Sequence, residues 1–203
     1  HQFSASHTFG SGCDPDQLSP STAFEPVCGS SIMSYSGNPI PFFHSFSIQQ
    51  ITNYSRTGTG SGCASIVQVQ NNEPELTLNY PNGFYIPIQT PFELNATTTD
   101  ADNDALTYSW EQLDPDGALF PMLTPSNNPK RVFPNLNSIL NDFINADGRL
   151  PDTTRDMSFR CLVRDNRTQA GASVWKDVKF KATKEAGPFR VTFPNDDTVQ
   201  WTA

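Results

Sequence analysis

Two short stretches, Ala105–Gln112 (ALTYSWEQ) and Met157–Arg164 (MSFRCLVR), contain the clearest structural signal in the chain. Apolar side chains recur at every second position in both; they are Leu106, Tyr108, Trp110, Phe159, Cys161 and Val163. Successive side chains of a β-strand point to opposite faces of the sheet, so this period of two is typical of half-buried strands. The two stretches therefore predict neighbouring strands of a β-sheet.

Similar short runs lie on either side of these stretches. They are Ala64–Val69, Glu75–Tyr80, Phe92–Thr99 and Val174–Thr183, and turn-forming residues separate them. This spacing predicts a two-sheet antiparallel β-sandwich over residues 64–184 and makes the protein mainly β. The connection from Leu113 to Pro151 is long for a loop, and we expect a helical turn in it at Leu136–Ile144.

The first part of the chain has a different pattern. Residues 1–44 lack a sustained period and predict coil, whereas Ser45–Asn53 predicts a short amphipathic helix that stops before Arg56, with Ser45 or Ser47 as its N-cap. The sequence TGTGSG follows, and we expect a linker over residues 57–63 between a first domain, 1–56, and the sandwich. Residues 185–203 predict the start of a further β domain, with strands at Phe189–Phe193 and Thr198–Trp201.

Composition excludes several classes of protein. The chain has 203 residues, 13 Lys and Arg against 21 Asp and Glu, and a formal net charge of −8. A surface that follows nucleic-acid phosphates needs clustered positive charge, so we expect no nucleic-acid partner. No run approaches the ~20 apolar residues that a membrane-spanning helix requires, so we expect no membrane span.

The four cysteines are Cys13, Cys28, Cys63 and Cys161. None of them forms a C-x-x-C pair, which argues against a zinc ribbon and leaves disulfides or single buried thiols. Four cysteines allow three full pairings, and we favour a local bridge between Cys13 and Cys28 because they flank a turn-rich segment. Cys161 lies in an apolar run and is expected to be buried.

Two histidines near the start, His1 and His7, are six residues apart. The second and third zinc ligands of the signature H-E-x-x-H-x-x-G-x-x-H have this spacing, although a terminal histidine and an unrelated surface or core histidine would share it. Met33 follows in SSIMSYSG, where small residues allow a tight turn and a methionine forms an apolar floor below a zinc site. The order of the two signals favours a metal site.

Four motifs then identify a family resemblance. HQFSASHTF, STAFEP, GSSIMSY and FHSFSIQQI, at residues 1–9, 21–26, 29–35 and 43–51, make residues 1–55 resemble bacterial reprolysin-like zinc metalloproteases of the metzincin class. The resemblance implies that His1 and His7 hold zinc in the parent protein, that Met33 belongs to the Met-turn, and that the substrates are proteins or peptides. It also implies a secreted or cell-surface bacterial location.

The chain departs from this family pattern at two points. The first histidine and the general-base Glu of the signature would lie upstream of His1, so we assign no catalytic residue within the chain and expect it to be inactive by itself. Ser4 stands where the family has Gly, at a turn in which positive φ is costly for a residue with a side chain.

A second resemblance concerns the later part of the chain. DADNDALTYSWEQLD at Asp100–Asp114 and FRCLVRDNR at Phe159–Arg167 resemble the immunoglobulin-like or cadherin-like modules that follow the catalytic domain in secreted proteases. GPFRVTFPN, from Gly187 to Asn195, is similar to the start of the next repeat. Further β domains of the same polypeptide are therefore expected as partners.

Three carboxylates of this part, Asp100, Asp102 and Asp104, alternate along an extended turn. Their carboxylates could converge on calcium, which prefers six to eight oxygen ligands, more than this one turn offers. The alternative is an acidic turn stabilised by hydrogen bonds to its own backbone.

Three further aromatic side chains are candidates for ligand binding. Trp110 and Trp175 suit either sugar stacking or core packing, and His44 suits packing better than metal binding. We therefore expect a fragment of a secreted zinc-dependent metalloendopeptidase with an accessory sandwich; the alternative is a non-catalytic cell-surface adhesion or carbohydrate-binding protein.

Overall fold

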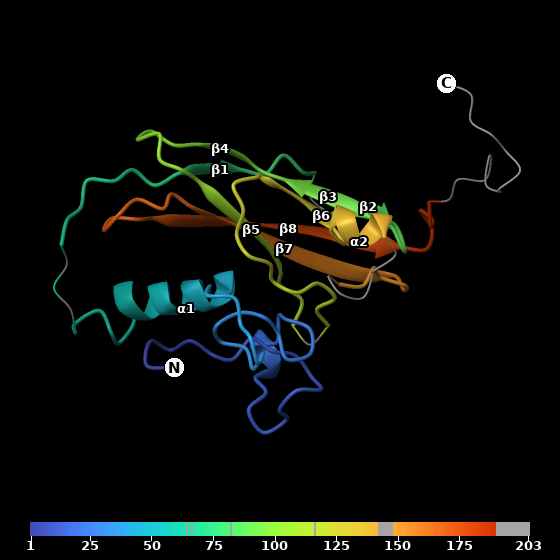
Figure 1. Cartoon of the computed structure of the whole chain (residues 1–203), viewed down its shortest axis with the longest axis horizontal. Helices are drawn as coiled ribbons and strands as arrows, with labels where there is room; N and C mark the ends of the chain where they lie inside the picture. Colours follow the sequence, from blue (N-terminus) through green and yellow to red (C-terminus); the bar gives the residue numbers. More distant parts are fainter. Residues whose placement is uncertain (64, 66, 82, 116, 142–147, 190–203) are drawn as a thin grey trace, which may run out of the picture.

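The computed structural model describes residues 1–63, 65, 67–81, 83–115, 117–141 and 148–189. The protein is mainly β (Figure 1). Its helices are a short 3₁₀ turn at Pro20–Thr22, α1 (Ser45–Arg56) and α2 (Leu136–Leu140). Its strands are β1 (Glu75–Thr77), β2 (Phe84–Pro87), β3 (Phe92–Asn95), β4 (Thr97–Thr99), β5 (Thr107–Gln112), β6 (Lys130–Phe133), β7 (Arg155–Arg164) and β8 (Ser173–Thr183).

The described strands form three sheets. The largest has the order β2-β8-β7-β5, and two-stranded antiparallel sheets form from β1 with β4 and from β3 with β6. The long β7 and β8 pair antiparallel from Arg155↔Ala182 to Arg164↔Ser173. The alternating stretches of the sequence thus form adjacent antiparallel strands, β5 and β7, as predicted.

Several expectations about strands need correction. β2 pairs parallel to β8, so the large sheet is mixed rather than wholly antiparallel. The stretch Phe92–Thr99 divides into β3 and β4 because its two halves pair with different strands, β6 and β1. Within Ala64–Val69, residues 65 and 67–69 form no strand; Val67 is 77% exposed, so no neighbouring strand covers it.

One face of the large sheet carries an aromatic core. Phe159 and Phe180, on β7 and β8, stack with ring centroids 5.7 Å apart. Phe92 of β3 and Phe133 of β6 stack 5.0 Å apart on the other side of the core and contact Phe159. Burying such large apolar surfaces is the main source of stability here, and it places the β3–β6 sheet against the large sheet.

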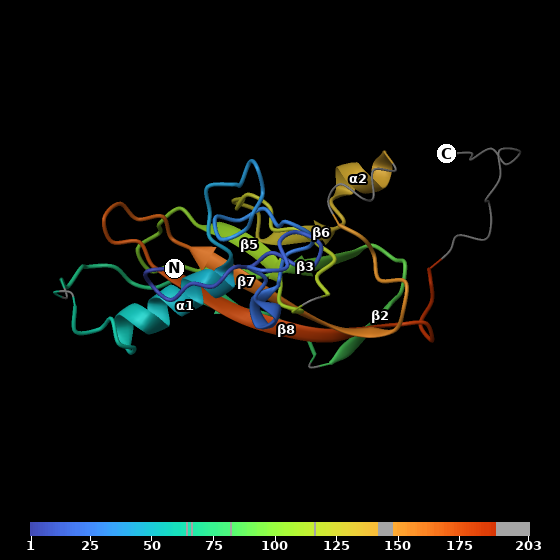
Figure 2. The ribbon, with the colours of Figure 1, turned by 90° about the horizontal axis from the view of Figure 1, so that it is seen from below.

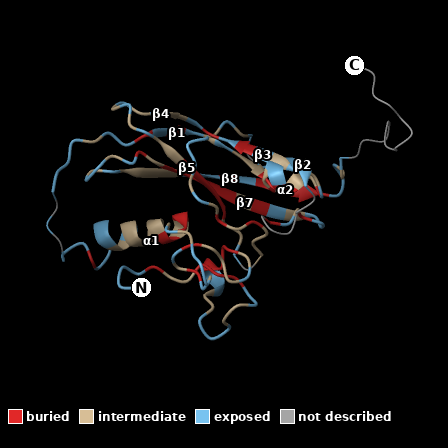
Figure 3. Ribbon diagram, viewed as in Figure 1, coloured by how far each residue is buried: buried red, intermediate tan, exposed pale blue. Residues whose placement is uncertain are grey.

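The opposite face of the large sheet is polar, and the N-terminal part of the chain covers it. Figures 1 and 2 place α1 and residues 1–44 along β5 and β7. Glu111 Oε2 of β5 accepts a hydrogen bond from the Ser45 backbone at 2.5 Å, and Arg160 Nη1 of β7 donates to Gln49 Oε1 at 2.6 Å. Buried positions are concentrated at this contact and in the aromatic core (Figure 3).

The predicted helix is present, but its start differs from expectation. His44, not Ser45 or Ser47, is the N-cap, and its Nδ1 accepts a hydrogen bond from the Phe46 backbone at 3.2 Å. Ser45 and Ser47 are fully buried because they face the sheet. The helix continues to Arg56, and residues 57–63 follow it as turns.

Other expectations have clear outcomes. The Cys13–Cys28 disulfide is confirmed, while Cys63 and the buried Cys161 are free. The helical turn predicted at Leu136–Ile144 appears as α2, with residues 142–144 outside the described part. Phe189 is not in a strand; the rest of Phe189–Phe193 and all of Thr198–Trp201 lie outside the described residues. Among the described helices, none has the length and apolar content needed to cross a bilayer.

Candidate functional site

A tight turn brings His1 and His7 together. Ser4 has φ +64°, in the left-handed region, and its backbone N–H donates to the His1 carbonyl at 3.0 Å. The turn that glycine would favour is therefore kept with a serine in its place. The Nε2 atoms of His1 and His7 lie 3.1 Å apart, and the ring centroids lie 4.4 Å apart.

The segment around Met33 fixes the orientation of His7. His7 Nδ1 lies 3.1 Å from the Met33 carbonyl oxygen, which only accepts hydrogen bonds, so Nδ1 carries the proton. In the neutral ring Nε2 then carries the lone pair, which can accept a hydrogen bond or bind a metal, and it lies next to His1 Nε2. A carbonyl bonded to the second imidazole nitrogen is the usual support of a metal-ligating histidine.

Tyr35 adds a third polar atom that sequence reasoning missed. Its hydroxyl lies 3.3 Å from His7 Nε2, and its ring stacks on Phe9 with centroids 4.7 Å apart. The available signal was its position two residues after Met33, in the same turn. Three donor atoms, two imidazole nitrogens and one phenol oxygen, thus meet at the surface.

Glu25 holds the segments beneath this cluster. Its carboxylate accepts hydrogen bonds from the Thr8 hydroxyl at 2.6 Å and the Ser31 hydroxyl at 2.5 Å. Burial raises the pKa of Glu25, but the charge on His44 and the donated hydrogen bonds outweigh burial, so the pKa lies below its usual value. The carboxylate is ionised and ties the His7 segment to the Met33 turn.

His44 is a structural residue rather than a ligand at the cluster. Its ring is 1% exposed and lies between the helix it caps and Glu111, whose Oε2 is 3.5 Å from His44 Nε2. Because Nδ1 accepts the Phe46 N–H, the ring's proton is on Nε2 in the neutral form and faces Glu111. This agrees with the sequence-based expectation of a packed histidine.

The predicted acidic site is assembled differently from the expectation. Single carboxylate oxygens of Asp100, Asp104 and Asp165 all lie within 4.8 Å of one another. Asp102 lies outside this cluster and accepts hydrogen bonds from the Asn72 backbone and side chain. Arg167 Nη1 lies 2.9 Å from Asp102 and 3.2 Å from Asp104, so it pairs with both. The Asn72 bonds and the charge on Arg167 lower the pKa of Asp102.

Asp165, at 1% exposed, follows β7 and is far from the other two in sequence, so local spacing gave no signal for it. Its partners are neutral N–H groups, including Asn71 Nδ2 at 2.6 Å. Asp100 Oδ1 accepts the backbone N–H groups of Asp102 and Asp104, whereas its Oδ2 is buried without a hydrogen-bond partner. The self-bonded turn is thus present, and the carboxylate cluster shares Asp100 and Asp104 with it while Asp165 takes the place expected for Asp102.

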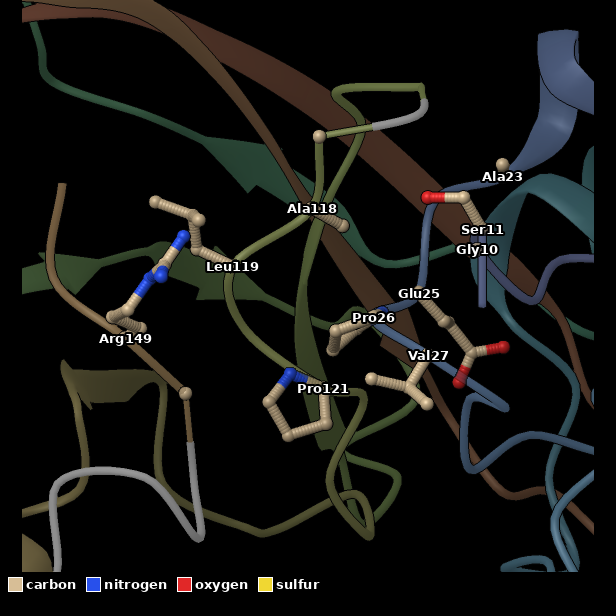
Figure 4. Close-up of a pocket in the computed structure, with 12 residues that line it drawn as sticks. Gly10, Ser11, Ala23, Glu25, Pro26, Val27, Ala118, Leu119, Pro121 and Arg149 are labelled. Carbon is tan, nitrogen blue, oxygen red and sulfur yellow. The ribbon is translucent and has the colours of Figure 1, made fainter. Parts of the chain in front are cut away.

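A cavity of about 540 Å³ lies between residues 10–27 and the β5–β6 connection. Figure 4 shows Pro26, Val27 and Pro121 around it, with Arg149 at one side and Glu25 at the other. Among the described residues that line it, these two are the charged ones, and the Glu25 carboxylate is already bonded to Thr8 and Ser31. The described lining pairs no nucleophile with a base.

The two tryptophans considered for sugar binding have different surroundings. Trp110 is 3% exposed and its Nε1 donates to the Pro129 carbonyl at 2.9 Å, so it belongs to the core. Trp175 is half-buried and Arg160 lies over its ring, 5.6 Å from the centroid. Trp110 therefore offers no stacking face, and Arg160 occupies one face of Trp175.

Neither a protein-family model nor a curated protein matches the chain.

Proposed function

We propose that the chain contains part of the zinc site of a secreted, reprolysin-like metalloendopeptidase. Residues 1–56 then belong to a metzincin catalytic domain, and residues 64–184 form an immunoglobulin-like accessory sandwich. The observation that supports this most is the convergence of His1 Nε2 and His7 Nε2, 3.1 Å apart, with His7 oriented by the Met33 carbonyl. The disulfide between Cys13 and Cys28 agrees with an oxidising compartment.

The donor set fits zinc. Neutral imidazoles are among its preferred ligands, and the phenol of Tyr35 adds an oxygen beside them. When bound, zinc would act as a Lewis acid on a peptide carbonyl. The residues of this chain orient the ligands: the Met33 carbonyl sets the His7 tautomer, and Glu25 anchors the segment that follows His7.

A peptidase also needs a carboxylate that accepts a proton from the attacking water. Within the described residues, neither His1 nor His7 forms an ion pair with an Asp or Glu; the histidine that does is His44. Two imidazoles without a third bind zinc weakly, and a metal-bound water with no base beside it is not activated; we expect the chain to bind zinc weakly and not to hydrolyse peptides by itself. The second expected cofactor, calcium, is proposed at Asp100, Asp104 and Asp165.

NMR of the three imidazoles tests the zinc proposal, because the chain has three histidines and His44 serves as an internal control. The α-amino group is acetylated so that it does not chelate metal. On addition of zinc, the ring signals of His1 and His7 should shift while those of His44 stay unchanged. His7→Ala should remove the His1 response, since one imidazole binds zinc far more weakly than two.

Two results would count against the zinc proposal: no shift of His1 and His7 at millimolar zinc, or an equal shift of His44. Cleavage of a fluorogenic peptide by the purified chain would contradict the expected inactivity. Tyr35→Phe provides a finer comparison, because it removes only the phenol oxygen and should weaken zinc binding less than His7→Ala.

A further inference from the structure

A second surface site lies on the polar face of the large sheet, beside β2. Figure 1 shows β2 at the end of the sheet away from α1. It is a hollow of about 530 Å³ over β2, β8 and β7. Tyr85 pairs with Lys181, and Lys181 pairs with Asp156, so these three side chains form one row across three strands. Ser158 and Lys179 form the adjacent row. Paired residues project to the same face, so both rows face the hollow.

The Tyr85 side chain on this face is largely exposed to solvent. Tyr85 is 68% exposed although it lies in a paired strand. Gly83, two residues earlier, also lines the hollow and has no side chain to fill the space beside the ring. An exposed tyrosine offers an apolar ring face together with a polar hydroxyl, which suits a ligand that is itself amphipathic.

Two acidic and two basic side chains line the hollow, Asp114, Asp156, Lys179 and Lys181, and three of the four already have partners. Lys181 Nζ lies 3.4 Å from Asp156 Oδ1, and Asp114 accepts hydrogen bonds from the Ser158 backbone and from Gln112. Among the charged side chains that line the hollow in the described part of the chain, Lys179 is the one without an ion pair or hydrogen bond. The Lys179 ammonium therefore has no partner among the described residues beside the exposed Tyr85 ring, and it can pair with an anionic group on a ligand.

We propose that this hollow binds a carboxylated pyranose, such as a hexuronate unit of an acidic polysaccharide. The sugar ring packs on Tyr85, and its carboxylate pairs with Lys179. Its hydroxyls, which both donate and accept hydrogen bonds, meet the Asp156 carboxylate and the Ser158 hydroxyl. The site is separate from the histidine cluster and needs no zinc, so it does not depend on the proposed peptidase function.

The matched probes are methyl β-glucuronide and methyl β-glucoside, which differ in the carboxylate at carbon 6. In an NMR titration, the glucuronide should shift the backbone amides of residues 85, 156–158 and 179–181, and the glucoside should bind about tenfold more weakly, as expected for one lost charged hydrogen bond. Tyr85→Ala should abolish both responses, whereas Tyr85→Phe should keep them because the ring face remains.

Lys179→Gln should remove the preference for the glucuronide. Lys176→Gln is the matched control: it is the same change on the same strand but on the opposite face, and the preference should persist. Acetate is the probe for a simple anion site. Three results overturn the proposal: no shift with either sugar, an equal loss in Lys176→Gln, or acetate binding as tightly as the glucuronide.

Discussion

At the residue scale, the unusual feature is the number of ionisable side chains that are buried between the N-terminal segment and the sheet. Glu25, His44 and Glu111 each have 1% of their surface exposed. Burying a charge is costly unless it is paired or hydrogen-bonded, and the neighbours of Glu25 and His44 meet this requirement. These contacts specify where the N-terminal segment lies, because an apolar interface would allow it to slide.

The two free cysteines should differ sharply in reactivity. Burial raises the pKa of Cys161 to about 12, with a smaller contribution from Glu111, whereas Cys63 is exposed. At pH 8, a thiol reagent such as DTNB should react with one thiol in the native protein and with two in urea, since the reactive form is the thiolate. Fast reaction of two thiols in the native protein would contradict this assignment.

The same shift makes stability depend on pH. The folded pKa of Cys161 lies above the unfolded value of about 8.5, so the unfolded state releases this proton first as pH rises. The contribution to stability is complete below about pH 8.5 and is lost as pH rises toward 12. Urea denaturation at pH 8 and pH 10 should show a smaller loss of stability in Cys161→Ala than in the wild type.

At the element scale, the β7–β8 hairpin organises the molecule. One face of it carries Phe159 and Phe180 into the core, and the other carries Arg160 to α1 and Lys179 to the proposed sugar site. The loop after β7 brings Asp165 to the turn between β4 and β5. One hairpin thus joins the core, the N-terminal segment and both proposed binding sites of the β part.

A calcium response of the β4–β5 turn should depend on Asp165 and not on Asp102. Calcium should raise the melting temperature of the wild type. At a calcium concentration one hundred times the dissociation constant, the free energy of unfolding should rise by about 2.7 kcal/mol. Asp165→Asn should lose the response, because a member of the carboxylate cluster is gone. Asp102→Asn should keep it, since Asp102 lies outside the cluster and accepts hydrogen bonds from Asn72.

Thermal melts in EDTA, calcium or magnesium measure this response. Magnesium should act more weakly, because it needs tight octahedral geometry. A melting temperature of the wild type that calcium does not move leaves the self-bonded acidic turn as the correct interpretation. If the calcium response is lost in Asp102→Asn but kept in Asp165→Asn, the ligands are Asp100, Asp102 and Asp104, as the sequence suggested.

At the scale of the whole molecule, the N-terminal segment and the β part meet across a polar interface. Besides the contacts of α1, the Ser30 hydroxyl donates to the Met122 carbonyl at 2.7 Å, and Arg164 lies over the Phe42 ring. The predicted linker at 57–63 therefore joins two parts that also hold each other by direct contact. The domain boundary placed there stays a prediction.

Limited proteolysis tests this arrangement. Cleavage should occur first near residues 57–63, where most side chains are exposed, and the two fragments should co-elute in size-exclusion chromatography. Glu111→Leu should release the N-terminal fragment, because it removes the acceptor of the Ser45 N–H and the partner of His44. The control Glu93→Gln changes an exposed glutamate that pairs with Lys130, and it should leave co-elution intact.

Fragments that separate without any substitution would show that the interface is too weak to hold the two parts together. Separation in Glu93→Gln as well as in Glu111→Leu would indicate a general loss of stability rather than a specific contact.

Much of the local structure was predictable from sequence. Alternation located β5 and β7, and a short run bounded by turn residues located β8. The spacing of apolar residues located α1, and the turn-rich segment between Cys13 and Cys28 indicated their disulfide. β2 and β6 escaped prediction because each is short and lacks a clear period of two. Tyr35 was missed at the histidine cluster because its role depends on where the Met33 turn places it.

The sequence by itself determined the mainly β character, the helix, the disulfide and the candidate ligands His1 and His7, because periodicity, turn chemistry and motif spacing act over short distances along the chain. Only the tertiary structure decided that Asp165 replaces Asp102 beside Asp100, that β2 runs parallel to β8, and that Tyr85 shares a face with Lys179. The physical reason is strand register: it joins residues distant in sequence through packing and backbone hydrogen bonds, and no local pattern encodes which distant residues will be neighbours.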